Sequence, residues 1–420
     1  MNLIKGSFIP PGDKSISHRA LLLSSIAEGK SRIRGFLNSK DCIGTKNCLL
    51  NLGILMEEKE EEIFVFGKGL YGMQAPSGIL DCENSATTMR LISGILAAQR
   101  FDSVLSGDES LCKRPMKRII DPLRQMGAEI RSHNESGFSP LFISGKALRG
   151  TDYLSPLASA QVKSAFLLAA LYADKESSFE EPSASRNHTE IMLGQMGAKL
   201  FTEDKKILIS PPKSLSPLDL SIPGDLSSAA YFIGAAILLP GSELYLKNLG
   251  LNPTRSGILK ALSEMGARIE ILNLDFSQGE ARADLLVRSS ALKGICIGGE
   301  IIPTMIDELP LLAAIATQAE GETRIRDAGE LRVKESDRIK AMTEGLRQIG
   351  AEVKETEDGM IIRGKSRLFS GKIRAYKDHR IAMSFAILSL LIEGGLQISD
   401  SDCICISYPS FFRDLKRLLR

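Results

Sequence analysis

A short phrase, a glycine between two apolar residues, recurs along the chain at the ends of helix-like segments. It stands at Leu52-Gly53-Ile54, Met126-Gly127-Ala128, Met196-Gly197-Ala198, Met265-Gly266-Ala267 and Ile349-Gly350-Ala351. The steps from glycine to glycine are 74, 70, 69 and 84 residues, and the segment FFRDLKRLLR supplies a last helix where a sixth copy would fall. The 420 residues therefore divide into six units of about 70. Such periodicity predicts an internal repeat, with each copy a small subdomain.

Each of these glycines has the sequence context of a helix end. The residue directly after a helix favours the left-handed backbone conformation, which glycine adopts without steric cost. The residues that follow, as in AEIRS and ARIEIL, alternate or run apolar as strands do. We therefore expect positive φ at these glycines and a strand after them. The acidic run 57–62 is expected to be a solvated loop.

Six further segments, rich in Ala and Leu, predict buried helices. Each opens with a polar cluster: SHRALLLSSIAEG, NSATTMRLISGILAA, SAQVKSAFLLAALYA, GDLSSAAYFIGAAIL, IDELPLLAAIATQAEG and DHRIAMSFAILSLLIEGG. Because they are apolar on all sides, they are expected to be buried on all sides. The repeat then comprises helix, strand, helix and strand, with further strands between, which is a mixed α/β fold.

Proline- and glycine-rich segments mark the expected domain boundaries. They lie at residues 10–12 and 211–224, and such segments are typical of linkers. One three-repeat domain is therefore expected at residues 13–223. The other is expected to combine residues 1–12 with residues 224–420.

Composition excludes several classes of protein. The net charge is +2, Trp is absent and aromatic residues make up 5% of the chain, so neither a basic nor a base-stacking surface for nucleic acid is predicted. The longest apolar runs, at 231–240 and 381–392, are too short to span a membrane. The seven cysteines lack CxxC spacing, which indicates reduced, mostly buried thiols in a cytoplasmic protein without a metal site.

The polar clusters at the helix starts contain basic side chains, among them Lys14, Arg19, Arg90, Lys163 and Arg380. A helix N-terminus presents unpaired N–H groups and the positive end of the helix dipole, so it attracts anions. Capping explains the Ser, Thr, Asn and Asp residues at these starts. It does not explain Lys or Arg there, and we infer that these residues have an anionic ligand.

Three local patterns need interpretation, and two of them leave alternatives open. PGDKS lacks the spacing of a phosphate loop, because Asp13 separates Gly12 from Lys14, and no ATP site is predicted. The segment ESDR is compatible with a helix-capping box as well as with a functional site. Asp307, flanked by apolar residues, is either a helix cap or a carboxylate that its surroundings make more basic.

Together, the motifs resemble those of the enolpyruvyl transferases, and among them the EPSP synthase (3-phosphoshikimate 1-carboxyvinyltransferase) family. The resemblance is carried along nearly the whole chain by PGDKSISHRALLLSSIAEGKSRIRG, NSATTMR, KRPM, SAQVKSA, SRNHTE, GLNPTR, LRVKESDR and DHRIAM. It implies two domains, each of three βαβαββ-type units, in an inside-out α/β barrel. It also implies transfer of the enolpyruvyl group of phosphoenolpyruvate to the 5-hydroxyl of shikimate 3-phosphate, with release of phosphate.

The resemblance assigns roles to residues of this chain. Both substrates carry a carboxylate and a phosphate, which would account for basic residues at helix starts. For shikimate 3-phosphate it implies contacts from Lys14, Ser15, Arg19, Ser159, Ala160, Gln161, Arg186, Asp307 and Lys334. For phosphoenolpyruvate it implies contacts from Lys14, Asn84, Ala86, Thr87, Arg114, Gln161, Arg338 and Arg380.

The implied chemistry is addition followed by elimination through a tetrahedral intermediate. It needs a base for the 5-hydroxyl proton and an acid for the methylene carbon of phosphoenolpyruvate. Asp307 matches the family's proton acceptor, and Lys14 and Glu335 are the candidates for proton delivery, with the division between them open. No metal or cofactor is implied, and we expect a monomer.

Two positions depart from the family pattern. Ala86 stands where many members have glycine, which leads us to expect tolerance to glyphosate, an inhibitor of the phosphoenolpyruvate pocket. Ile406 stands where other members have a lysine, which leaves one phosphate contact without its residue.

Two other functions are weighed against this one. UDP-N-acetylglucosamine enolpyruvyl transferases use a loop cysteine ahead of an Arg-Pro pair. Cys112 lies near Arg114-Pro115, but the spacing differs. A nonenzymatic repeat scaffold would need a basic face or an exposed apolar stripe, and the sequence indicates neither.

Overall fold

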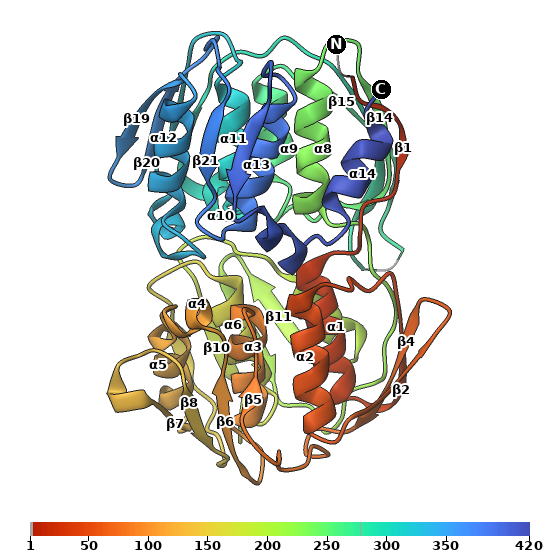
Figure 1. Ribbon diagram of the computed structural model, residues 1–420. Helices are drawn as coiled ribbons and strands as arrows, with labels where there is room; N and C mark the ends of the chain where they lie inside the picture. The colour runs from red at the N-terminus through yellow and green to blue at the C-terminus, as the bar shows by residue number, and fades with distance from the viewer. Residues whose placement is uncertain (1–2, 278) are drawn as a thin grey trace. The chain divides into compact units, whose positions relative to one another are not determined.

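The computed structural model describes residues 3–277 and 279–420. The chain forms two compact units, which consist of Gly12–Ile222 (the N-terminal unit) and of Met1–Pro11 with Pro223–Arg420 (the C-terminal unit). Both units combine helices with small sheets (Figure 1). The mixed α/β fold predicted from the sequence is confirmed.

Within the described residues, five four-stranded sheets share one topology. In the sheet β5-β6-β8-β7, β5 (Leu80–Asp81) is parallel to β6 (Asp102–Ser106), while β8 (Leu141–Ser144) is antiparallel to both β6 and β7 (Glu129–Ser132). In each sheet two strands that follow one another in the chain form a hairpin that adds to the parallel pair.

The other sheets repeat this order. In the N-terminal unit they are β13-β2-β4-β3 (Asp219–Ser221, Glu28–Arg34, Glu62–Lys68, Leu55–Lys59) and β9-β10-β12-β11 (Asp152–Leu154, Ser177–Glu180, Lys206–Ser210, Lys199–Glu203). In the C-terminal unit they are β1-β14-β16-β15 (Lys5–Phe8, Glu243–Gly250, Arg282–Arg288, Arg268–Asp275) and β17-β18-β20-β19 (Cys296–Ile297, Glu322–Ile325, Gly359–Arg363, Glu352–Thr356). A sixth sheet has only the parallel pair β21 (Gly371–Arg374) and β22 (Leu396–Ser399).

Two kinds of helix accompany the sheets. The Ala/Leu-rich segments form the central helices, which are almost entirely buried: α1 (Lys14–Ser25), α3 (Ala86–Leu96), α6 (Ala160–Ala170), α8 (Leu226–Leu238), α11 (Leu309–Ala316) and α13 (His379–Ser389). The second helices expose one face: α2 (Lys40–Asn51), α5 (Lys117–Gln125), α7 (His188–Gln195), α9 (Gly257–Glu264), α12 (Arg338–Gln348) and α14 (Phe411–Leu418). Short helices α4 (Glu109–Cys112) and α10 (Ile302–Met305) complete the set.

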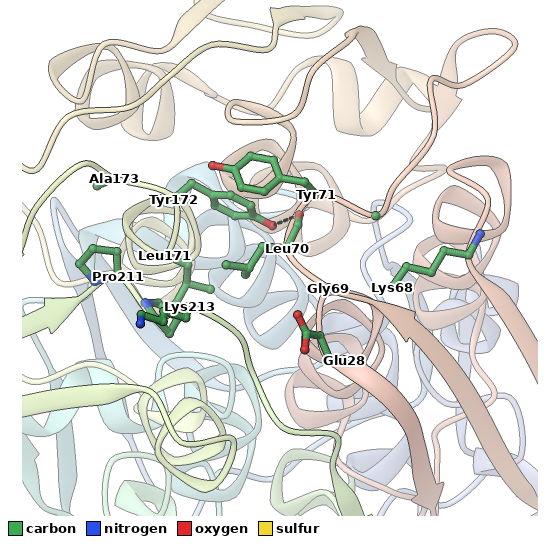
Figure 2. Close-up of a pocket in the computed structure, with 12 residues that line it drawn as sticks. Glu28, Lys68, Gly69, Leu70, Tyr71, Leu171, Tyr172, Ala173, Pro211 and Lys213 are labelled. Carbon is green, nitrogen blue, oxygen red and sulfur yellow. Dashed lines mark hydrogen bonds between the residues drawn. The ribbon is translucent and has the colours of Figure 1, made fainter.

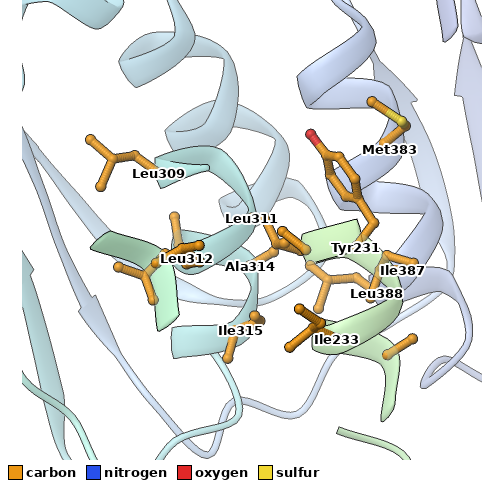
Figure 3. Packing of buried hydrophobic residues seen from close by; sticks show 14 of the residues in the cluster. Tyr231, Ile233, Leu309, Leu311, Leu312, Ala314, Ile315, Met383, Ile387 and Leu388 are labelled. Atoms are coloured by element: carbon orange, nitrogen blue, oxygen red, sulfur yellow. The ribbon is translucent and has the colours of Figure 1, made fainter. Parts of the chain in front are cut away.

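The core of the C-terminal unit lies between its central helices. Leu311 and Ile315 of α11, Ile233 of α8 and Ile387 of α13 belong to one buried apolar cluster (Figure 3). Burying apolar surface on all sides of a helix is the main favourable term in such a core. The N-terminal unit has its own separate cluster around α1, α3 and α6.

The predicted helix ends are confirmed. The five glycines of the recurring phrase have φ of 77° (Gly53), 89° (Gly127), 86° (Gly197), 94° (Gly266) and 95° (Gly350). Strands β7 and β15 follow two of them, as expected from AEIRS and ARIEIL. The expectation of a loop at 57–62 is wrong, because these residues belong to the β3–β4 hairpin and only Glu60 and Glu61 form its turn, with φ of 50° and 66°.

The predictions about membrane spans and about the cysteines can be compared with the described residues. None of the described helices has both the length and the apolar character that a membrane span requires. The cysteines described are all free, and four of them, Cys42, Cys48, Cys82 and Cys403, are buried.

Candidate active site

In the N-terminal unit, the three central helices begin with polar caps. Asp13 accepts a hydrogen bond from the backbone N–H of Ile16 at 2.9 Å, and Ser85 accepts one from Thr88 at 3.1 Å. Ser159 accepts one from the N–H of Val162 at 3.5 Å. Each cap satisfies one N–H group of the first turn, and the other N–H groups there have no intrahelical partner.

The start of α1 collects basic side chains. Lys14 Nζ lies 3.0 Å from a carboxylate oxygen of Asp41 in α2. Arg19 donates to Thr189 Oγ1 and Ser164 Oγ, both at 2.7 Å, and its Nη2 lies 3.5 Å from the carbonyl oxygen of Ala160. Arg19 is thus fixed between α1, α6 and α7.

Arg186 joins this group. Its Nη1 lies 3.5 Å from Ser15 Oγ. The structure therefore brings together Lys14, Ser15, Arg19, Ala160 and Arg186, which the sequence predicts as shikimate 3-phosphate contacts.

A second group forms at the start of α3. Gln161 Nε2 donates to Thr87 Oγ1 at 2.8 Å, and Arg90 donates to Gln161 Oε1 at 2.5 Å. Arg114 donates to Asn84 Oδ1 at 2.8 Å. Ala86 is the first residue of α3 and is 5% exposed. Apart from Lys14 of α1, the phosphoenolpyruvate residues predicted in this unit therefore lie at or beside this helix start.

In the C-terminal unit, Arg338 lies at the centre of a charge network. Its Nε donates to Asp378 at 2.8 Å, and its Nη2 donates to Glu335 at 2.6 Å. Its Nη1 lies 3.3 Å from Asp307. Burial opposes the charge of Arg338, but the carboxylates of Asp378, Glu335 and Asp307 outweigh it and raise the pKa of the guanidinium above its usual value.

Arg380 lies on the other side of Asp307. Its guanidinium nitrogens are 4.0 Å from Asp307 and 3.6 Å from Glu308. Burial opposes its charge as well, and Tyr231, Asp307 and Glu308 raise its pKa. Burial, with Arg380 and Arg338 opposing it, raises the pKa of Tyr231 to about 12, so this phenol is neutral.

The charged side chains of the same region also affect Lys334. Burial lowers the pKa of its ammonium group, while Asp307 and Glu330 oppose this effect. Its closest carboxylate oxygen, in Glu330, is 4.0 Å away. The structure thus brings Asp307, Lys334, Glu335, Arg338 and Arg380 together.

The alternatives left open by the sequence are resolved for two segments. Asp307 is not the cap of α11, because Glu308 is the residue at that position and its side chain makes no cap hydrogen bond. In ESDR helix capping is confirmed, since Asp337 caps α12 through the N–H of Lys340 at 3.0 Å, and Glu335 pairs with Arg338.

Several carboxylates that hold basic residues were not predicted from the sequence as their partners. In the C-terminal unit each central helix has an acidic residue at its N-cap position, and each of these pairs with an arginine: Asp225 with Arg255 at 2.8 Å, Glu308 with Arg380, and Asp378 with Arg338. Asp41 of α2 likewise forms an ion pair, with Lys14. An acidic residue before each Ala/Leu-rich run was the available signal, but its partner lies far away in sequence.

Ile406 brings no charge to the site. It ends the 3₁₀ helix Ser401–Ile406 and packs, partly buried, against the apolar core. Among the described residues, no group of three or more His, Cys, Asp and Glu side chains could hold a metal ion.

A cavity of about 480 Å³ lies elsewhere in the N-terminal unit (Figure 2). Glu28, Tyr71, Tyr172 and Lys213 are among its lining residues, and the Tyr172 hydroxyl donates to the carbonyl oxygen of Leu70 at 3.0 Å. Its lining includes none of the residues predicted to bind the substrates.

Comparisons with known proteins agree with the geometry. The model of the family EPSP synthase (3-phosphoshikimate 1-carboxyvinyltransferase) matches residues 1–415. The 3-phosphoshikimate 1-carboxyvinyltransferase of Bacillus cereus (strain G9842) is 48% identical over 419 residues, covering 100% of this chain and 98% of its own. The enzyme of that name from Thermodesulfovibrio yellowstonii is 49% identical over 418 residues, covering 99% and 97%.

Solved structures are similar over the same length. An EPSP synthase from Acinetobacter baumannii aligns with a TM-score of 0.89 and 42% identity, covering 100% of this chain and 97% of its own. The enolpyruvyl transferase NikO from Streptomyces tendae aligns with a TM-score of 0.79 at 16% identity, covering 100% and 96%. The latter similarity supports the fold alone.

Proposed function

Because the chain belongs to the EPSP synthase family, its reaction is the transfer of the enolpyruvyl group of phosphoenolpyruvate to the 5-hydroxyl of shikimate 3-phosphate. We propose that the residues assigned below carry it out. The observation that carries the proposal is the position of Asp307 between two buried arginines, Arg338 and Arg380. Stability alone does not favour two buried guanidinium groups around a partly exposed carboxylate.

Arg338, Arg380 and Arg114 are the proposed ligands of phosphoenolpyruvate. A guanidinium offers paired N–H donors that match a carboxylate or phosphate. Asp378 and Glu335 hold Arg338 at 2.8 and 2.6 Å, so its orientation is set before substrate binds. At the start of α3, Asn84, Ala86, Thr87 and Gln161 complete the proposed contacts, with Lys14 from α1.

The start of α1 is the proposed site for shikimate 3-phosphate. Lys14, Ser15, Arg19 and Arg186 converge there with the first turn of α6, where Ser159, Ala160 and Gln161 lie. A helix N-terminus with adjacent basic side chains is a suitable phosphate site. We assign Asp307 and Lys334 of the C-terminal unit to the same substrate.

Asp307 is the proposed acceptor of the 5-hydroxyl proton. Lys14 and Glu335 are the proposed donors and acceptors for the methylene carbon of phosphoenolpyruvate. Glu335 is hydrogen-bonded to Arg338 and Lys14 to Asp41, so both side chains are held in place for proton transfer.

The finer architecture is proposed on the same basis. The shared sheet order and the six central helices support six βαβαββ-type units, three in each domain, in an inside-out α/β barrel. We take residues 13–223 as one domain and residues 1–12 with 224–420 as the other. We also propose that the protein is a cytoplasmic monomer that needs no cofactor.

Phosphate release with two acceptors tests the function. Phosphoenolpyruvate is mixed with the protein and either shikimate 3-phosphate or UDP-N-acetylglucosamine, and inorganic phosphate is measured. We expect release with shikimate 3-phosphate alone. Release with UDP-N-acetylglucosamine alone would assign the chain to the other branch of enolpyruvyl transferases, and release with neither would refute enzymatic transfer.

A further inference from the structure

The first turns of the central helices in the N-terminal unit differ at one buried position. Three residues after the N-cap, α1 has Ile16 and α6 has Val162, both buried. At the same position α3 has Thr88, which is fully buried. A buried hydroxyl is unfavourable unless it is hydrogen-bonded, so the threonine requires an explanation that its apolar counterparts do not.

Thr88 lies in a chain of hydrogen bonds that crosses three helices. Its Oγ1 is 2.8 Å from Oγ of Ser85, the N-cap of α3, and 2.6 Å from Oγ1 of Thr45 in α2. Thr45 Oγ1 is in turn 2.6 Å from Nδ1 of His18 in α1. The four residues are at most 2% exposed, so the chain is shielded from solvent.

The hydrogens of this chain can be counted. Burial, Lys14 and Arg19 lower the pKa of His18 well below its usual value, so the ring is neutral and carries one N–H. With the hydroxyls of Thr45, Thr88 and Ser85 there are then four hydrogens for three hydrogen bonds. Thr88 Oγ1 donates to Ser85 Oγ, so Thr45 must donate to Thr88 and His18 to Thr45, and the hydrogen left over is that of Ser85.

The burial of His18 agrees with this direction. His18 Nε2 has no hydrogen-bond partner among the described residues. A buried N–H without an acceptor is rarer than an unpaired acceptor. The hydrogen of His18 is therefore on Nδ1, and donation runs from His18 through Thr45 and Thr88 to Ser85.

We propose that this chain positions the first turn of α3 for phosphoenolpyruvate and that Thr88 is the positioning residue within it. Ser85 Oγ then accepts from both the N–H and the hydroxyl of Thr88, which fixes the cap. The earlier N–H groups of the helix, those of Ala86 and Thr87, are left for an anion. The inference rests on the proposed function, which takes the start of α3 as part of the phosphoenolpyruvate site.

Two substitutions of Thr88 separate positioning from packing. Thr88→Val keeps the branched shape that Val162 has in α6 but removes the hydroxyl, whereas Thr88→Ser keeps the hydroxyl and removes the methyl group. We expect Thr88→Val to raise the KM for phosphoenolpyruvate by about 3- to 10-fold, the range of one hydrogen bond. Its kcat and its KM for shikimate 3-phosphate should each change by less than about twofold.

Thr88→Ser should retain the wild-type KM for phosphoenolpyruvate and melt at a lower temperature, because it leaves a small cavity. If both variants raise that KM equally, or if Thr88→Val leaves it unchanged, the chain has only a packing role and the proposal is wrong.

The tautomer of His18 gives a second test that does not depend on activity. The chain contains four histidines, and ¹⁵N NMR with His18→Gln as the assignment control identifies the signals of this ring. We expect a neutral ring with its hydrogen on Nδ1, and a changed Nδ1 signal in Thr45→Val. A hydrogen on Nε2, or identical spectra in the two proteins, would overturn the proposal even if enolpyruvyl transfer is measured. An inactive wild-type protein would instead refute the proposed function.

Discussion

Three carboxylates share the guanidinium of Arg338, and their exposure separates their roles. The side chain of Asp378 is 0% exposed, whereas those of Asp307 and Glu335 are 19% and 20% exposed. Asp378 also accepts the N–H of Arg380 at 2.9 Å and so caps α13. A substrate can therefore reach Asp307 and Glu335, while Asp378 holds the network in place.

Asp307→Asn should lower kcat by roughly 10²- to 10⁴-fold, the usual contribution of a general base. The variant should keep the thermal stability of the wild-type protein, because its side chain is partly exposed. Asp378→Asn is the matched variant, and it should be destabilised by about 3–5 kcal/mol, since it leaves Arg338 buried without its main partner. A folded Asp307→Asn protein with wild-type turnover would remove this residue from the mechanism.

The lowered pKa of Lys334 predicts a pH dependence. Lys334 binds an anion only when protonated, and burial lowers its pKa below the usual value. The kcat/KM for shikimate 3-phosphate should fall as the pH rises through that lowered pKa. Lys334→Arg stays protonated at alkaline pH, so its decline should move to higher pH. Superimposable profiles for the two proteins would assign the decline to another group.

Ala86→Gly should make the protein more sensitive to glyphosate and keep its activity. The methyl group projects ~1.5 Å from the backbone, and a clash of that size in a packed pocket costs ~1–3 kcal/mol. This corresponds to roughly 5- to 150-fold in affinity. Inhibition curves at matched phosphoenolpyruvate concentration measure the effect. Superimposed curves would mean that Ala86 only favours the helix.

Most of the basic site residues could be named from the sequence, whereas their partners could not. Lys14 and Arg380 stand in recognisable polar clusters at helix starts. Asp41 pairs with Lys14 across 27 residues, and Asp378 with Arg338 across 40. No local pattern reports such contacts, because they depend on how the repeats pack.

At the scale of elements, local backbone chemistry made helix ends predictable. Gly53 and Gly350 both have the positive φ expected of them. The short strands β1 and β13 could not be predicted, since each pairs with a strand about 190 or more residues away, β14 and β2 respectively. The acidic hairpin was missed because Glu and Lys are poor strand formers, and pairing overrode that preference.

The close packing of central helices predicts an asymmetry between two glycines. A Cβ atom at Gly94 in α3 would lie 2.2 Å from the carbonyl oxygen of Ala165 in α6, whereas one at Gly194 in α7 would meet no atom within 4 Å. Gly94→Ala should therefore lower the free energy of unfolding by about 1–3 kcal/mol. Gly194→Ala should raise it by roughly 0.5–1 kcal/mol, through helix propensity. Urea unfolding compares them, and equal effects would contradict the proposed close contact of α3 with α6.

At the scale of the whole molecule, the division of the sequence into six repeats agrees with the six sheets found among the described residues. The longest step, 84 residues from Gly266 to Gly350, contains extra segments absent from other repeats, including α10 and the 3₁₀ helix Gly329–Val333. The sixth sheet lacks the hairpin, because the chain after β22 forms a 3₁₀ helix and α14 instead. The periodicity carries no information about how the repeats pack within each unit.

The central claim, enolpyruvyl transfer by addition and elimination, is tested by running the reaction in D₂O. Addition places a solvent hydrogen on the methylene carbon of phosphoenolpyruvate and makes it a methyl group, and elimination then removes one of its three hydrogens. The methylene group of the product should therefore contain deuterium, as measured by proton NMR, while phosphoenolpyruvate incubated with the protein alone should not exchange. A product formed from shikimate 3-phosphate that keeps both original methylene protons would contradict the account.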